Sequence, residues 1–154
     1  IFQDSLKEGQ AGEDFFYELN KDTLERLDGL KNDFKIIKTG DNIELKSDYY
    51  SVEKTPNFFM ETVSVLSDNK QGGPFQALAN GNKYYVYFFV KDKVMYIFET
   101  EKLVNRLNEI KDNYEDCQIP NKNHITIGKK IPREALKDIY KERIITSKKS
   151  IADF

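Results

Sequence analysis

Two acidic residues and a lysine alternate with other side chains along a short predicted strand, residues 43–48 (Ile-Glu-Leu-Lys-Ser-Asp). Side chains of a β-strand point alternately to its two faces, so Glu44, Lys46 and Asp48 are expected to share one face. Carboxylates beside an ammonium group can form a divalent-metal site with a cationic helper. The same face is also typical of plain solvent-facing surface, so a second element has to decide between these interpretations.

That second element is the predicted strand over residues 58–66, which carries one carboxylate, that of Glu61, on the same side as Phe59. Burying an unpaired charge in a core is unfavourable by several kcal/mol, so a carboxylate on an apolar side of a strand needs a partner. If neighbouring strands bring Asp48 and Glu61 together beside Lys46, the product is a metal site suited to phosphodiester hydrolysis.

Composition limits the class of protein. A chain of 154 residues is expected to form one domain with a real core. The net charge of −2 argues against a protein that coats nucleic acid through charge alone. The single cysteine, Cys117, excludes an internal disulfide framework and a cysteine-based zinc cluster, and it fits an intracellular, cytoplasmic protein. The longest strongly apolar run, residues 84–90, is too short to cross a bilayer, so no membrane partner is expected.

Positive charge gathers towards the end of the chain. Residues 128–150 hold eight basic residues against three acidic ones. The basic residues are Lys129, Lys130, Arg133, Lys137, Lys141, Arg143, Lys148 and Lys149. This segment is predicted either to contact phosphates or to form a solvated helix face with salt-bridging charges.

Hydrophobic periodicity and turn residues predict the order of the elements. The expected elements are a helix over 12–28, strands over 34–38, 43–50 and 58–66, a short helix over 75–79, strands over 83–90 and 94–99, a helix capped by Thr100, a short strand over 125–127 and a last helix over 132–145. This order favours an α/β fold with a central mixed β-sheet flanked by helices (αβββαββα) and a short C-terminal β-α extension. The expected division is an α/β domain over residues 1–115 and a basic extension over 116–154, packed on the same domain.

The order of these elements, with Asp48 and Glu61 on successive strands, resembles the PD-(D/E)XK nuclease superfamily, in particular its compact phage-type members. Gly9 precedes Glu13 by four residues, which is similar to the family's first-helix pattern. The resemblance implies that Glu13, Asp48 and Glu61 hold Mg²⁺ or Mn²⁺. It also implies that a lysine orients the attacking water or stabilises charge on the phosphate.

The chain departs from the family pattern at the lysine. The pattern has acid-x-Lys on the third strand, whereas here Val63 stands two residues after Glu61. Lys46 is the favoured replacement, Lys70 is the alternative lysine, and Ser64 is the nearest polar residue. A second register, Asp33 with Glu44-Leu45-Lys46, matches the literal motif including its lysine. It ranks second because the expected fold needs a helix and a buried strand after the motif strand, and that order follows Glu61.

The resemblance therefore predicts a metal-dependent endonuclease that hydrolyses phosphodiester bonds in DNA, with RNA as an alternative substrate. A lost lysine is also how members of this family become catalytically inactive modules that bind nucleic acid or a protein. A small interaction protein, in which these acids are merely surface, is the third alternative. A homodimer is compatible with each of these functions.

Overall fold

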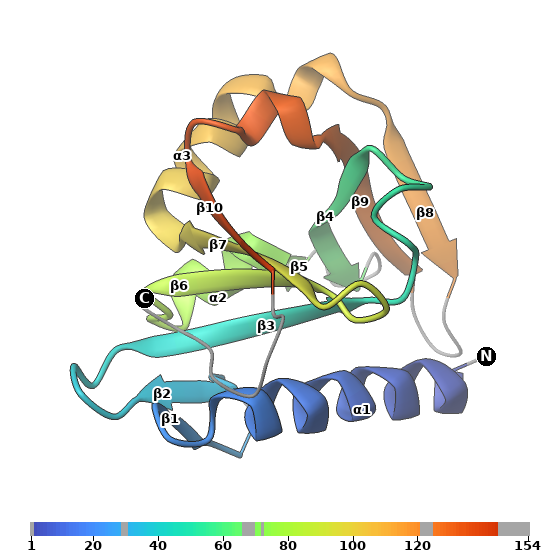
Figure 1. The fold of residues 1–154 in the computed structure, drawn as a ribbon. Coiled ribbons are helices and arrows are strands. Elements are labelled where there is room, and N and C mark those ends of the chain that lie inside the picture. The colour runs from blue at the N-terminus through green and yellow to red at the C-terminus, as the bar shows by residue number, and fades with distance from the viewer. Residues whose placement is uncertain (1, 29–30, 66–69, 72, 121–124, 145–154) are drawn as a thin grey trace.

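Two β-sheets and three α-helices make up the described part of the chain in the computed structural model (Figure 1). The structure describes residues 2–28, 31–65, 70–71, 73–120 and 125–144. No helix within these residues is long and apolar enough to cross a membrane. The fold is α/β with a mixed sheet, as the sequence predicts.

The larger sheet has six strands in the order β1-β2-β3-β6-β7-β10. Its strands are β1 (Leu24–Arg26), β2 (Phe34–Ile36), β3 (Asn42–Asp48), β6 (Tyr84–Phe89), β7 (Val94–Glu99) and β10 (Tyr140–Ile144). All neighbouring pairs are antiparallel except β3 and β6, which run parallel. Parallel neighbours need a crossover connection, and the segment between β3 and β6 supplies it.

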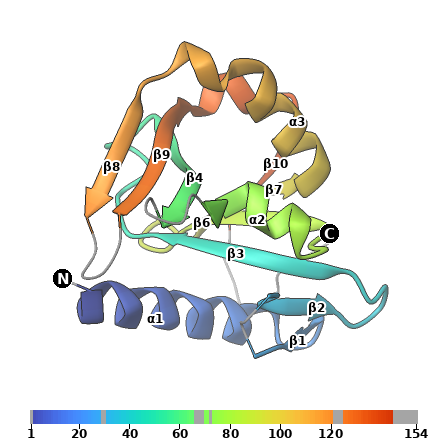
Figure 2. The ribbon, with the colours of Figure 1, turned by 180° about the vertical axis from the view of Figure 1, so that it is seen from behind.

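The smaller sheet forms within that crossover and is completed from the C-terminal part of the chain. Its order is β5-β4-β9-β8, with all pairs antiparallel. The strands are β4 (Asn57–Val65), β5 (Lys70–Gln71), β8 (Asp116–Pro120) and β9 (Ile125–Pro132). In Figures 1 and 2 this sheet lies at the end of the molecule where helix α1 begins, and β3 runs between the helix and this sheet.

The two faces of the larger sheet have separate apolar cores. Helix α1 (Phe2–Asn20) lies along β3 on one face (Figure 2), where Phe16 packs with Phe34 and Phe88. On the other face, aromatic residues of β6 and β7 pack against Phe58 of β4 and against helix α3 (Thr100–Ile110). The short helix α2 (Gly73–Ala79) follows β5 and contacts β4 and α3.

Several predicted elements have different bounds or a different kind. The first helix ends at Asn20, and β1 occupies part of the segment expected to continue it. The expected last helix over 132–145 is wrong, since the end of β9, a 3₁₀ turn (Arg133–Leu136) and strand β10 occupy residues 132–144. Tyr140 of β10 lies over the apolar cluster around Phe58, and this tertiary packing outweighs helix propensity.

The most consequential difference concerns β4. We expected the strand that carries Glu61 to be the third strand of the central sheet, but it pairs with β9 in the other sheet. The expected core side of this strand is also wrong, because Phe58 and Met60 are buried while Phe59 and Glu61 are only partly buried. Because β4 leaves the larger sheet, the strand that pairs in parallel with β6 is β3.

The segment expected to form a basic extension begins at residue 116. From this position on, the chain supplies β8 and β9 to the smaller sheet and β10 to an edge of the larger one. The described residues 116–120 and 125–144 therefore contribute to both sheets, and their basic side chains stand on strands and turns rather than on one helix face. Lys148 and Lys149 lie outside the described residues.

Candidate functional site

Asp33 and Glu44 meet where strands β2 and β3 separate. The two strands pair only through Phe34 opposite Ile43 and Lys35 opposite Asn42, after which β3 continues alone on that side. The Asp33 backbone N–H donates to the Ile43 carbonyl at 3.0 Å, and the Asp33 carboxylate accepts the Leu45 N–H at 2.8 Å. The carboxylate of Asp33 is thus fixed beside the strand that carries Glu44.

Glu13 reaches the same place from helix α1, because the helix passes unusually close to β3. A Cβ atom added at Gly12 would lie 2.2 Å from Oγ of Ser47 and 2.7 Å from its Cβ. Only a glycine permits this approach without displacement of the helix or the strand. Glu13 follows directly, and its side chain hydrogen-bonds with that of Asp33.

Glu61 joins these three residues electrostatically from the smaller sheet. Its charge contributes to raising the pKa of Glu44 and that of the buried Tyr85 phenol, which lies opposite Glu44 on β6. Close approach of α2 fixes this part of β4, because a Cβ at Gly73 would lie 2.7 Å from the Glu61 carbonyl oxygen. We call Glu13, Asp33, Glu44 and Glu61 the carboxylate cluster.

The cluster holds protons that isolated carboxyl groups would lose. Burial, and then the hydrogen bond and charge of Asp33, raise the pKa of Glu44 to about 10. Burial and the neighbouring Asp33 likewise raise the pKa of Glu13 to about 7, although the charge of Arg26 opposes the shift. Negative charges gathered in a partly buried place make each further ionisation unfavourable. Such perturbed carboxyl groups are typical of functional sites.

Lys46 stands two residues after Glu44 on the same face of β3, with Tyr87 as its neighbour on β6. Its side chain is partly buried and makes no ion pair with any residue that the structure describes. The backbone of Lys70 lies in β5, but the side chain of this alternative lysine is outside the described residues.

Asp48, expected to work with Glu61, has two other partners. Its carboxylate accepts the Tyr87 hydroxyl at 2.5 Å and the Tyr50 backbone N–H at 2.8 Å. The same hydroxyl of Tyr87 accepts the Phe59 N–H at 3.0 Å, so Asp48 takes part in a bridge between the two sheets. Strands β3 and β4 are not neighbours in a sheet, and Glu61 influences Glu44, four residues before Asp48.

The cluster is not preformed as a metal site. Within the described residues, no three acidic, histidine or cysteine side chains are arranged so that they could hold a metal ion. The chemistry of the donors nevertheless fits Mg²⁺ or Mn²⁺, because these cations prefer carboxylate oxygens. A bound cation would take the place of the protons that now relieve the repulsion among Glu13, Asp33 and Glu44.

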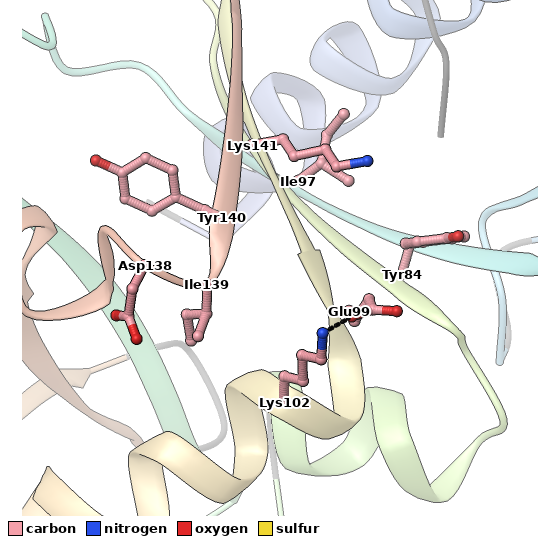
Figure 3. Close-up of a pocket in the computed structure, with 8 residues that line it drawn as sticks. All are labelled: Tyr84, Ile97, Glu99, Lys102, Asp138, Ile139, Tyr140 and Lys141. Atoms are coloured by element: carbon pink, nitrogen blue, oxygen red, sulfur yellow. Dashed lines mark ion pairs between the residues drawn. The ribbon is translucent and has the colours of Figure 1, made fainter.

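A cavity of about 540 Å³ lies elsewhere, beside β7, β10 and the start of α3 (Figure 3). Glu99 and Lys102 on its wall form an ion pair at 2.6 Å, and Asp138 is held by Arg106 at 2.7 Å. No member of the carboxylate cluster lines this cavity. Three of its four charged lining residues, Glu99, Lys102 and Asp138, already take part in these ion pairs, so it offers less chemistry than the cluster does.

No protein-family model matches this sequence, and no curated protein was found to match it. The candidate site therefore rests on the residues and geometry of this chain alone. The sequence did indicate Asp33 and Glu44 as site residues. Asp33 matches the first acid of the family motif, and Glu44-Leu45-Lys46 matches its acid-x-Lys part. Arg26, whose charge acts on Glu13, stands in no recognisable motif.

Proposed function

We propose that this protein is a metal-dependent nuclease of the PD-(D/E)XK type, with Glu13, Asp33, Glu44 and Lys46 as its principal site residues. One observation carries the proposal. Three carboxylates converge, those of Glu13 on α1, Asp33 directly before β2, and Glu44 on β3. Lys46 stands two residues after Glu44 on the same strand.

The connectivity supports the second register of the motif rather than the first. Helix α1 is followed by β1, β2 and β3, and the parallel neighbour β6 comes after a crossover that contains helix α2. The acid-x-Lys strand of the expected fold is followed by a helix and a buried parallel strand, and β3 with Glu44 and Lys46 meets that requirement. Strands β4 and β5 are then an insertion within the crossover, and the later strands β8 and β9 complete the smaller sheet.

The residues have distinct roles in this proposal. Glu13, Asp33 and Glu44 would hold Mg²⁺ or Mn²⁺, and Glu61 would add negative charge from the opposite side. When bound, such an ion polarises a phosphate and lowers the pKa of water. Lys46 would orient the attacking water or stabilise charge on the phosphate, because an ammonium group beside the carboxylates is attracted to developing negative charge. DNA is the proposed substrate, and internal cleavage the proposed mode.

The test is a cleavage assay on labelled single- and double-stranded DNA and RNA with Mg²⁺ or Mn²⁺, beside an EDTA control. Wild type is expected to cleave, and Glu44→Gln to lower the rate on the order of 100-fold or more. Lys46→Met is expected to lower the rate while Mn²⁺ affinity, measured by calorimetry, stays unchanged. Glu25→Gln, at an exposed carboxylate on β1, is the matched control and should cleave like wild type.

A second candidate function has one observation in its favour. The carboxylates share protons and are not arranged to hold an ion, which is also expected of a catalytically inactive module of the same fold that binds nucleic acid or a protein. If wild type cleaves none of the substrates and binds Mn²⁺ no better than Glu44→Gln, this alternative replaces the nuclease.

A further inference from the structure

Arg26 lies at the rim of the carboxylate cluster and is held there by backbone pairing. It stands opposite Phe34 in the β1–β2 pair, next to Asp33, and the following residue, Leu27, donates its N–H to the Asp33 carbonyl at 2.9 Å. The guanidinium forms an ion pair with Asp14 at 2.5 Å, one residue beyond Glu13 on helix α1. The arginine is thereby joined to the two elements that supply Glu13 and Asp33.

This cation is accessible, and its present partner is weakly bound. The Arg26 side chain is 34% exposed and that of Asp14 is 59% exposed. Ion pairs between solvent-exposed groups contribute little stability, because water screens them and both side chains lose freedom. An anion that offers two oxygens to the planar guanidinium can therefore replace Asp14.

A nucleic-acid substrate has to approach the carboxylate cluster, whose ionised members repel its phosphates. The charge of Arg26 already acts at this place, since it lowers the pKa of Glu13 against the effect of burial. We infer that Arg26 is a substrate-binding residue that holds a phosphate of the nucleic-acid chain beside the carboxylate cluster, with Asp14 as its partner until substrate displaces it. The inference rests on the proposed function, from which it takes the class of substrate.

The experiment measures binding rather than cleavage. A short fluorescein-labelled DNA duplex is titrated with protein carrying Glu44→Gln, and anisotropy gives the affinity between about 50 and 200 mM salt. Adding Arg26→Gln should weaken binding by about three- to tenfold and reduce the slope of log affinity against log salt by about one. Adding Asp14→Asn should strengthen binding, because the competing carboxylate is gone.

The matched control is Lys21→Gln, which removes another exposed cation directly after the end of helix α1, one that pairs with Glu18 at 3.5 Å. It should leave the salt slope unchanged. Thermal unfolding of every variant checks that the fold persists. The inference is overturned if Arg26→Gln and Lys21→Gln have the same affinity and salt slope, or if Arg26→Gln and Asp14→Asn weaken binding equally. In either case the ion pair only stabilises the fold.

The two proposals fail in different ways. A wild-type protein that binds the duplex through Arg26 but never cleaves it contradicts the nuclease and leaves the phosphate contact standing. A protein that cleaves, with binding indifferent to Arg26→Gln, contradicts only the phosphate contact. A protein that binds no nucleic acid overturns both.

Discussion

The carboxylate of Asp33 accepts the backbone N–H of Leu45, with 2.8 Å between Oδ2 and the nitrogen. Leu45 lies between Glu44 and Lys46, so this hydrogen bond fixes the two proposed site residues of β3 relative to Asp33. It lies at the point where the pairing between β2 and β3 stops. The side chain of Asp33 thus continues the pairing of the strands by one step and orients the cluster at the same time.

Two substitutions at Asp33 should separate these roles. Asp33→Asn keeps an oxygen that accepts the Leu45 N–H, so the fold should persist while metal-dependent cleavage falls on the order of 100-fold or more. Asp33→Ala removes the acceptor too and should lower the free energy of unfolding by about 1–3 kcal/mol, because it leaves the partly buried Leu45 N–H unpaired. Urea unfolding and the cleavage assay measure the two effects. Equal activity of Asp33→Asn and wild type would remove Asp33 from the site.

Local pattern was sufficient for most elements of the larger sheet. Alternating and continuous apolar runs predicted β2, β3, β6 and β7, because β2, β6 and β7 bury most of their apolar side chains and β3 buries Ile43. The sequence could not assign β4 to the right sheet, since a strand reads the same whichever neighbour it pairs with. Nor could it predict β10, whose four residues after Tyr140 are exposed and carry no burial pattern.

The same limitation affected the site. Glu44 and Lys46 were predicted to share a face of one strand, and the structure agrees. Choosing their acidic partner required knowing that β4 leaves the sheet, which is a tertiary fact. The literal motif spacing from Asp33 to Glu44 indicated two acids that lie together, because it depends only on a hairpin whose two strands are close in sequence.

Asp48 should matter for stability more than for chemistry. Asp48→Asn weakens a charge-assisted hydrogen bond with Tyr87 and is expected to lower the free energy of unfolding by about 1–2 kcal/mol. Tyr87→Phe removes the same bridge and the partner of the Phe59 N–H, so it should cost at least as much. Both variants should keep metal-dependent cleavage when assayed well below their unfolding temperature.

That outcome discriminates between the two registers of the motif. If Asp48→Asn abolishes cleavage and Mn²⁺ binding while Glu44→Gln preserves them, the site is built on Asp48 and Glu61, and the register proposed for Asp33 and Glu44 is wrong. Far-ultraviolet circular dichroism of each variant guards against attributing a folding defect to catalysis.

The shared protons predict how stability depends on pH. Glu13 and Glu44 have pKa values raised to about 7 and about 10, chiefly by burial and next by Asp33, whereas the ordinary pKa of a glutamate is 4.5. Between those limits the folded state binds more protons than the unfolded state. The stability that these groups contribute is therefore full below about pH 4 and is lost as pH rises through the folded values.

Wild type should accordingly lose stability between about pH 5 and pH 8, and Glu44→Gln should lose less. At pH 8 the variant is expected to be more stable than wild type on the order of 1–2 kcal/mol, because a buried ionisable group has been replaced by a neutral one. Urea unfolding at both pH values measures the difference. Glu25→Gln, at an exposed carboxylate, should follow wild type, and a Glu44→Gln curve parallel to wild type would contradict the coupling.

Divalent cations should reverse that loss. An ion that binds only the folded protein stabilises it by about 2.7 kcal/mol at a concentration one hundred times its dissociation constant. The increase in unfolding temperature with Mn²⁺ should be larger at pH 8 than at pH 6, because binding requires release of the shared protons. Asp48→Asn should show the same increase and Glu44→Gln should show none, whereas an equal increase in both would point to binding outside the cluster.

The close approach of α1 to β3 predicts an unusual effect of a conservative substitution. Replacing glycine by alanine inside a helix normally stabilises it by roughly 0.5–1 kcal/mol. At Gly12 the new methyl group would meet Ser47, so Gly12→Ala should instead destabilise the protein by about 1–3 kcal/mol and displace Glu13 from Asp33. A double-mutant cycle with Ser47→Gly, measured by urea unfolding and by the cleavage assay, isolates the contact. The pair should couple favourably, with activity partly restored in the double variant, and additive effects would mean that Gly12 does not set the position of Glu13.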